Sequence, residues 1–406
     1  MLSEWSQKCQ KARVKEGETL ADVLAPALAI VPDRTAIHFE GRDISYRELD
    51  ELSNRVANGL IGIGIMPGDR VAIHIDNRPE FIWVYLGTMR VGGVLVPTNI
   101  MYTAEEMEHI LTDSGARAVF TLSPMVEKLR KANAPELETI IELGGKSTGD
   151  VAFDDFMSNA ATSRPDVKRD PSKAAIIQYT SGTTGKPKGA MVSDNNILAV
   201  LRNTQDLPSA LPGLEEDVTL CVLPLFHAYA LDLVINRSFT SAQTLVLHAR
   251  FDATKIFEAI QTHRVTLFYG APPMYHAFVN TPGLDKFDAS SLRGAFSGAA
   301  PLPVVVMERF KALTGVQIHE GYGLSETAPT LTTNMAGPVN KPGAVGPPID
   351  EVEIRLVDDN DNEVEPGQVG EVVARGPNIF LGYWNRPDAT EEAFRGGWFH
   401  TGDMGR

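Results

Sequence analysis

The chain has 406 residues, 43% of them apolar, and a formal net charge of −15. A chain of this length is expected to fold as two or three packed units rather than around one core. The acidic balance argues against nucleic acid as a partner, because it repels phosphate backbones. The two cysteines, Cys9 and Cys221, give neither a disulfide framework nor a metal-ligand spacing, so we expect a cytoplasmic protein.

An apolar stretch from Leu20 to Ile30 follows several basic residues near the N-terminus. Asp22 and Pro26 interrupt it, and it is too short to span a bilayer. We interpret it as one amphipathic helix that docks on the domain. Peripheral membrane contact through the basic residues is the alternative. The sequence is compatible with a homodimer but does not fix the oligomeric state.

Apolar runs of strand length alternate with helical runs over most of the chain. The predicted strands are 70–75, 94–97, 118–120, 175–179, 219–223, 244–247, 266–269 and 292–296. The predicted helices that separate them are clearest at 79–91, 105–113 and 253–263. This rhythm predicts an α/β fold with two helix-covered, mostly parallel sheets packed together.

The pattern changes after residue 338. Residues 352–374 alternate between apolar and polar, with turns at 358–362 and at Pro366-Gly367, so we expect a small antiparallel, barrel-like β subdomain. The acidic turn lacks the glycine and distal glutamate of an EF-hand, and a solvated hairpin turn is the better interpretation. The predicted units are therefore 1–170, 171–339 with a phosphate loop, and 340–406.

The most informative segment is the glycine-rich loop that follows the strand 175–179. Its residues are Thr180, Ser181, Gly182, Thr183, Thr184, Gly185, Lys186, Pro187, Lys188 and Gly189. Glycines let backbone N–H groups converge on an anion, hydroxyls add donors, and the lysines add positive charge. The spacing is not that of a Walker A loop. An ordinary flexible loop is the alternative, but the fixed pattern predicts a phosphate-binding loop.

This loop resembles the phosphate loop of the adenylate-forming enzymes, which comprise acyl-CoA synthetases, peptide-synthetase adenylation domains and firefly-type luciferases. The resemblance continues along the chain in segments 297–302, 321–327 and 397–403. It implies that adenine lies against Gly298, Ala299, Ala300 and Pro301 and stacks on Tyr322, within a nucleotide site that includes Gly321, Gly323 and Ser325. It implies further that Asp403 accepts hydrogen bonds from the ribose, and that Glu326 and Thr183 bind Mg²⁺.

The same resemblance places the acid beside His227, Tyr229, Tyr269, Gly270, Gly298 and Gly321. His227 stands where peptide-synthetase domains usually carry an aspartate for the substrate amino group, so an amino acid is disfavoured. A lone histidine among apolar residues is otherwise a core residue, and the segment 268–275 can equally be plain core. Because no arginine occurs in Gly321-Tyr322-Gly323, the sequence favours a monocarboxylic, mostly apolar acid.

The implied chemistry is ATP-dependent activation of a carboxylic acid to its acyl-adenylate, followed by thioester formation with coenzyme A. Thr180, Lys188, Glu326 and His227 are the implied catalytic residues, with Mg²⁺ as cofactor. Medium- and long-chain fatty acids are favoured and aryl acids come second. A non-catalytic nucleotide- or acyl-binding protein on the same fold is the alternative. The sequence ends at Arg406, about where the resemblance expects a C-terminal domain with a catalytic lysine, so we expect impaired activity.

Overall fold

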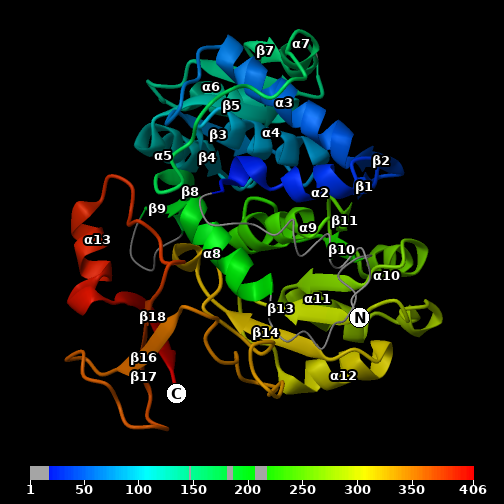
Figure 1. Cartoon of the computed structure of the whole chain (residues 1–406), viewed down its shortest axis with the longest axis vertical. Coiled ribbons are helices and arrows are strands. Elements are labelled where there is room, and N and C mark those ends of the chain that lie inside the picture. Colours follow the sequence, from blue (N-terminus) through cyan, green and yellow to red (C-terminus); the bar gives the residue numbers. More distant parts are fainter. Residues whose placement is uncertain (1–17, 146–147, 181–185, 206–216) are drawn as a thin grey trace.

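The computed structural model describes residues 18–145, 148–180, 186–205 and 217–406. Two large sheets lie one above the other in Figure 1, and a third, small sheet lies beside the lower one. The sequence-predicted fold class, two mostly parallel sheets with a small antiparallel one, is confirmed.

The first sheet has the order β7-β6-β5-β3-β4-β8-β9. All neighbours pair in parallel except β8 and β9, which are antiparallel. The strands are β3 (Arg70–His74), β4 (Val94–Pro97), β5 (Ala116–Leu122), β6 (Thr139–Leu143), β7 (Val151–Ala152), β8 (Ala174–Thr180) and β9 (Lys188–Ser193).

The second sheet has the order β15-β14-β13-β12-β10-β11-β1-β2. Its inner pairs are parallel, and the outer pairs β1–β2 and β14–β15 are antiparallel. The strands are β1 (Thr35–Phe39), β2 (Arg42–Ser45), β10 (Val218–Cys221), β11 (Thr244–Leu247), β12 (Leu267–Gly270), β13 (Gly294–Ser297), β14 (Ile318–Tyr322) and β15 (Thr332–Thr333).

Each large sheet contains strands from both of the first two predicted units. Strands β1 and β2, from the start of the chain, belong to the second sheet, whereas β8 and β9, after residue 170, belong to the first. The predicted boundary at 170/171 therefore does not coincide with a change of sheet. The division into three consecutive units stays a prediction.

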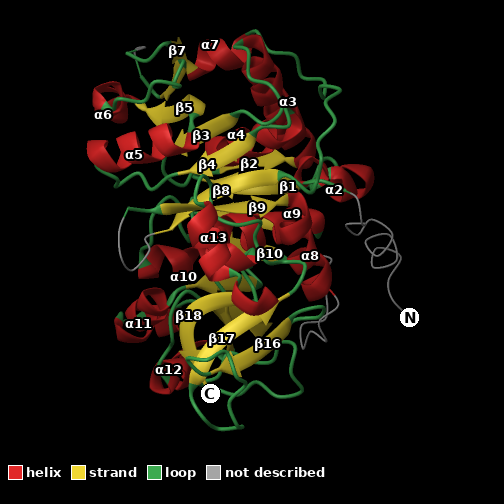
Figure 2. Ribbon diagram, turned by 90° about the vertical axis from the view of Figure 1, so that its left-hand side faces the viewer, coloured by secondary structure: helices red, strands yellow, loops and turns green. Residues whose placement is uncertain are grey.

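Helices cover both large sheets and fill the space between them. The α-helices are α2 (Ala25–Ile30), α3 (Tyr46–Gly62), α4 (Pro79–Arg90), α5 (Ala104–Ser114), α6 (Val126–Lys131), α7 (Phe153–Ser158), α8 (Asp194–Gln205), α9 (Asn236–Thr240), α10 (Ala253–Thr262), α11 (Pro272–Asn280), α12 (Val304–Thr314) and α13 (Pro387–Ala393). Figure 2 shows α10, α11 and α12 along one side of the second sheet, where they enclose a separate apolar core. Helix α4 is buried along its length, as expected of a helix with little polar surface.

The caps explain where several helices begin and end. Ser45 accepts the N–H of Glu48 at the start of α3. Thr103 and Glu106 form a capping box at the start of α5, which ends at Gly115 with a φ of 62°.

The predicted N-terminal helix over 20–30 is wrong as a single helix. A 3₁₀ turn, η1 (Leu20–Asp22), precedes the short helix α2, and Pro26 lies at the start of α2 because it cannot continue a helix from the preceding turn. Leu20, Leu24 and Ala27 are nevertheless buried in the central core, so the segment does dock. Within the described residues, no helix is long and apolar enough to cross a membrane. Peripheral membrane contact and a cytoplasmic location stay predictions.

The small sheet has the order β16-β17-β18, with β16 (Glu353–Val357), β17 (Gly370–Arg375) and β18 (Phe399–Gly405) all antiparallel. It lies at the lower left of Figure 1, close to helix α13. The segment between β17 and α13 leaves this sheet and pairs with β9: Ala190 and Tyr383 form an antiparallel bridge. The small sheet is thereby tied to the strand that follows the phosphate loop.

A buried ion pair fixes the connection between β7 and β8. Arg169 donates to Asp194 at 2.6 Å, and the two side chains are 5% and 0% exposed. Asp194 also accepts the N–H of Leu20 at 2.7 Å, and Arg169 donates to the carbonyl of Gly93. The pair therefore joins the N-terminal segment, the first sheet and the start of α8.

We expect Arg169→Met to lower the free energy of unfolding by about 3–5 kcal/mol, because it leaves Asp194 charged, buried and without its cation. Chemical denaturation of both proteins measures the difference. Arg264→Met is the matched control, since Arg264 and Asp288 form an exposed pair and should contribute little. An equal loss in both variants would contradict the expectation.

Candidate active site

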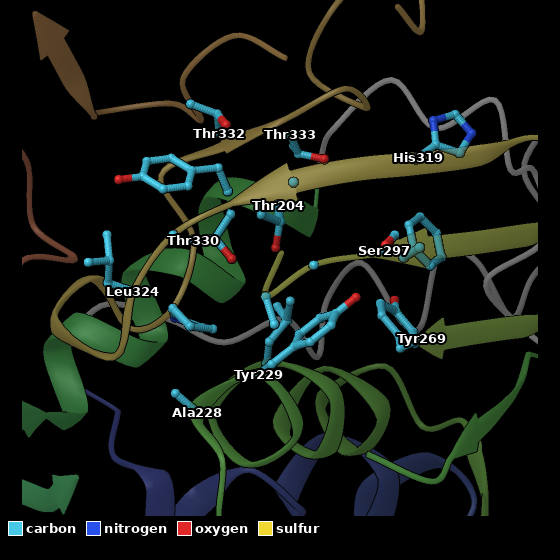
Figure 3. A pocket seen from close by; sticks show the side chains of 18 of the residues that line it. Thr204, Ala228, Tyr229, Tyr269, Ser297, His319, Leu324, Thr330, Thr332 and Thr333 are labelled. Carbon is cyan, nitrogen blue, oxygen red and sulfur yellow. The ribbon is translucent and has the colours of Figure 1, made fainter. Parts of the chain in front are cut away.

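A cavity of about 220 Å³ lies at the carboxyl ends of β12, β13 and β14. In α/β sheets this edge is the usual place for a ligand, because the loops that leave parallel strands meet there. Figure 3 shows Tyr229 projecting toward Tyr269 and Ser297 on the neighbouring strands. The sequence-predicted residues in its lining are His227, Tyr229, Tyr269, Gly298, Ala299, Gly321, Tyr322, Gly323 and Ser325.

An aromatic ladder forms one wall of this cavity. Tyr269 on β12, Phe296 on β13 and His319 on β14 are register partners across three parallel strands. The rings of Tyr269 and Phe296 are stacked at 4.6 Å between centroids, and Phe296 lies 6.0 Å from His319. Such a wall presents flat faces to a bound ring.

The lack of a side chain on Gly298 lets the ring of Tyr229 pack close to the backbone at that residue. A Cβ atom built on Gly298 would lie 3.1 Å from Cε1 of Tyr229. Gly270, by contrast, lies outside the cavity lining. A Cβ there would meet Phe268 at 2.6 Å and Tyr275 at 3.1 Å, so its small size serves packing behind the strand. Ala300 and Pro301 also lie outside the lining.

His227 lies just before the π-helical segment η4 (Tyr229–Ile235). Its carbonyl accepts the N–H groups of Ala230 and Leu231, which fixes the backbone. Burial lowers the pKa of the imidazole, so the ring is neutral at neutral pH. A neutral ring beside a substrate carboxylate can donate one hydrogen bond without adding charge.

A second cluster adjoins the cavity through the 3₁₀ turn η6 (Ser325–Thr327). Ser325 lines the cavity, and the next residue, Glu326, is only 7% exposed. Oε1 of Glu326 accepts the hydroxyl of Tyr383 at 2.9 Å, and the Thr180 side chain also bonds to Glu326. Nζ of Lys188 lies 5.3 Å from the centroid of the Tyr383 ring.

Two opposing effects act on the pKa of Glu326. Burial raises it, as does the nearby charge of Asp403, while the hydrogen bonds from Tyr383 and Thr180 lower it. Burial is the largest of these effects, so the pKa of Glu326 is raised overall, and the hydrogen bonds limit the rise.

The residues predicted to bind adenine and ribose, Tyr322 and Asp403, are in direct contact. The hydroxyl of Tyr322 donates to Oδ2 of Asp403 at 2.8 Å, although the two residues are 81 positions apart. Asp403 lies on β18, so the small sheet brings its carboxylate to the edge of the cavity. Lys186 is exposed, and residues 181–185, which include Ser181, Gly182, Thr183, Thr184 and Gly185, lie outside the described residues.

A family model described as "AMP-binding enzyme" matches residues 26–384. The chain belongs to this family. The chain is 33% identical to a long-chain-fatty-acid–CoA ligase of Bacillus subtilis (strain 168), with 96% of this chain and 74% of the relative covered. It is 35% identical to a feruloyl-CoA synthase of Amycolatopsis sp, over 92% of this chain and 73% of that one.

Solved structures agree with this assignment. The anthranilate CoA ligase AuaEII in complex with anthranoyl-AMP superimposes with a TM-score of 0.90 at 27% identity, over 98% of this chain and 76% of that chain. The sequence-based resemblance to adenylate-forming enzymes is confirmed, and so is the enzyme class of acid–thiol ligase. Use of ATP and coenzyme A follows from membership of this AMP-binding family.

Mg²⁺ fits the Glu326 cluster by donor chemistry. Mg²⁺ prefers hard oxygen ligands and commonly uses one or two carboxylates together with substrate phosphates. Glu326 supplies a carboxylate, and the hydroxyl of Thr180 adjoins it. Among the described residues no group of three or more histidine, cysteine or acidic side chains could hold a metal ion by itself. Nucleotide phosphates would have to supply the remaining ligands.

Two residues of the site in this AMP-binding enzyme, Tyr383 and Arg237, were not identified from the sequence. Tyr383 falls within the predicted β subdomain, 340–406, but it bonds to Glu326 and lies beside Lys188. Arg237 on α9 was not considered, yet it lines the cavity. The only local signal for Tyr383 was its place in the segment Gly382-Tyr383-Trp384, which matches the family.

We expect Tyr383→Phe to move the pH dependence of Mg²⁺–ATP binding upward. We expect this binding to need ionised Glu326 and to be lost as the pH falls through the pKa of Glu326. The variant loses a hydrogen bond that lowers this pKa, so binding is lost at a higher pH than in the unmodified protein. Titration calorimetry at a series of pH values measures the midpoint.

Tyr179→Phe is the matched control, because it removes a similar phenol–carboxylate bond, 2.8 Å to Asp113, that does not involve Glu326. Its midpoint should stay unchanged. Equal upward shifts in both variants would rule out a specific effect on Glu326.

Proposed function

We propose that this chain binds ATP with Mg²⁺ and a carboxylic acid and joins them as an acyl-adenylate, from which coenzyme A accepts the acyl group. The observation that supports the proposal best is the junction between the cavity and the Glu326 cluster. Ser325 lines the cavity, and the adjacent Glu326 contacts Thr180 and Tyr383 beside Lys188. An acid in the cavity would therefore lie next to groups suited to phosphates.

In the first step a carboxylate oxygen of the acid attacks the α-phosphorus of ATP. The new O–P bond forms as the bond to the β-phosphate oxygen breaks, and pyrophosphate leaves. Two anions must approach each other in line, so charge neutralisation and positioning dominate over nucleophilic catalysis. Thr180 and Lys188 would hold phosphate oxygens, and His227 would orient the carboxylate. Mg²⁺ on Glu326 would supply charge neutralisation at the phosphates.

In the second step the sulfur of coenzyme A attacks the acyl carbonyl. The carbon–sulfur bond forms, the mixed anhydride breaks, and AMP leaves with the electron pair. Asp403 and Tyr322 would hold the ribose and the adenine during both steps. Their mutual hydrogen bond supports this role, because it places an acceptor and an aromatic face together.

The acid is either aliphatic or aromatic, and relatives of both kinds are known. One relative is named a long-chain-fatty-acid–CoA ligase and another a feruloyl-CoA synthase. The sequence alone favours a medium- or long-chain fatty acid. The side chains that line the cavity help to distinguish an aliphatic from an aromatic acid.

The test is acid-dependent release of pyrophosphate from ATP by the 406-residue chain, with and without Mg²⁺, followed by thioester analysis after addition of coenzyme A. We expect pyrophosphate release that needs both the acid and the metal. Binding of ATP and acyl-adenylate mimics without any pyrophosphate release would favour the alternative, a non-catalytic nucleotide- or acyl-binding protein.

A further inference from the structure

One helical face extends from the predicted carboxylate end of the cavity into its interior. Tyr229 and Leu233 on η4 and Arg237 on α9 follow one another at intervals of four residues, and all three line the cavity. Their shared place in the lining shows that this helical segment turns one side toward the cavity. Arg237 lies ten residues beyond His227 along the chain.

Arg237 is half-buried and has few partners. Its one described hydrogen bond joins Nη1 to the carbonyl oxygen of Thr204 at 3.2 Å. No carboxylate among the described residues lies within ion-pair distance of it. A guanidinium has five N–H donors and keeps its charge at any physiological pH. A cation facing a cavity without an anionic partner is costly unless a ligand supplies acceptors.

Tyr269 contributes a second polar group to the same region. Its hydroxyl makes no hydrogen bond within the described part of the chain, although the residue is only 5% exposed. Burial raises the pKa of Tyr269, the positive charge of Arg237 opposes this shift, and the negative charge of Asp217 adds to it. Tyr269 and Arg237 both line the cavity, so together they offer several donors to a ligand there.

The walls around these donors suit a ring better than an alkyl chain. Tyr269, Phe296 and His319 form the aromatic ladder, and Tyr229 faces it at 6.3 Å from the ring of Tyr269. Flat aromatic faces pack well on one another in offset or edge-to-face arrangements. The cavity of about 220 Å³ also includes the predicted adenine loop at Gly298 and Ala299, so the acid and the nucleotide would share it.

We infer that the acid activated by this chain is an aromatic carboxylic acid whose ring carries a hydrogen-bond-accepting substituent, a hydroxyl or a second carboxylate, bound by Arg237 and Tyr269. This inference rests on the proposed function. It reverses the preference for fatty acids, because the end of an alkyl chain would leave the Arg237 guanidinium desolvated and unpaired. No arginine occurs in the segment Gly321-Tyr322-Gly323, but the fold supplies Arg237 from α9.

Calorimetric titration with a panel of acyl-adenylate mimics, in which a sulfamoyl group replaces the phosphate, tests the inference. The panel contains an unsubstituted aryl acid, its para-hydroxy and para-carboxy derivatives, and an alkyl acid of equal length. We expect the substituted rings to bind about 10- to 100-fold more tightly than the alkyl mimic. The para-hydroxy and para-carboxy compounds distinguish a neutral from an anionic acceptor.

Arg237→Met should remove the preference for the substituted rings while the unsubstituted ring binds as before, which shows that the variant is folded. Arg237→Lys should retain part of it, because the charge remains but the fork of donors is lost. Arg130→Met, at an exposed arginine on α6, is the control and should change nothing.

Tighter binding of the alkyl mimic, or an unchanged preference in Arg237→Met, would overturn this inference and leave the proposed function standing. Failure of every mimic to bind would overturn both.

Discussion

Replacement of Gly323 by alanine is expected to weaken binding of the nucleotide and of acyl-adenylate mimics strongly. A Cβ atom at this position would lie 1.8 Å from the carbonyl oxygen of Pro329 and 2.9 Å from the Cα atom of Thr330. Both contacts are with backbone, so no side-chain rotation can relieve them. The turn from residue 323 to residue 330 must move as a whole.

That displacement has consequences for the site because the same turn carries Ser325 and Glu326. Overpacking of a well-packed region typically costs 1–3 kcal/mol, so we expect a loss of stability of about 3 kcal/mol. The loss of mimic affinity should be on the order of 100-fold or more, since the loss of even one well-placed charged contact already approaches that factor.

Thermal unfolding and calorimetric titration of Gly323→Ala measure the two effects. Gly62→Ala is the control, because a Cβ atom on this glycine at the end of α3 meets nothing within 4 Å. It should leave binding unchanged and stability equal or slightly higher. Normal mimic binding by Gly323→Ala would show that the turn does not form part of the nucleotide site.

Glu326→Gln is expected to lower the rate of pyrophosphate release by a factor on the order of 10² to 10³. The substitution keeps the shape of the side chain, and the amide oxygen can still accept the hydroxyl of Tyr383. What it removes is the negative charge. We therefore expect the loss to come from weaker Mg²⁺ binding, with the acid and the adenine still bound.

The measurement is the rate of pyrophosphate release as a function of Mg²⁺ concentration. Glu320→Gln is matched for burial, since Glu320 is 6% exposed and Glu326 is 7% exposed. Glu320 accepts N–H groups of Leu302 and Gly343 instead of the hydroxyls that Glu326 accepts. Its variant should lose stability but keep the original Mg²⁺ dependence. An unchanged Mg²⁺ dependence in Glu326→Gln would remove Glu326 from the metal site.

Contiguous features were predictable from the sequence because they depend on local chemistry. The strand 94–97 and the strand 244–247 have the predicted bounds, and the helix predicted over 253–263 is one residue shorter. The segment 321–327 was assigned to the nucleotide site because it resembles the corresponding segment of the adenylate-forming enzymes. The structure then places residues 321–325 around one cavity.

Contacts between distant segments could not be predicted in this way. Tyr383 reaches Glu326 only because the backbone at residues 381–384 pairs with β9. Arg237 reaches the cavity only because the π-helical turn η4 and α9 present one face to the ends of β12 and β13. The family match of residues 382–384 does not distinguish Tyr383 from a packing tyrosine, and Arg237 has no local pattern that distinguishes it from a surface arginine.

The exchange of strands between the two sheets sets the order in which the chain can fold during its synthesis. Strand β1 can form a hairpin with β2 at once, but its parallel neighbour is β11, in which Leu245 is the partner of Ile37. At 5–20 residues per second, a ribosome needs about 10–40 s to synthesise the roughly 200 residues between them. Throughout that interval α3, which packs on β1 and β2, or a chaperone must shield the apolar face of the first hairpin.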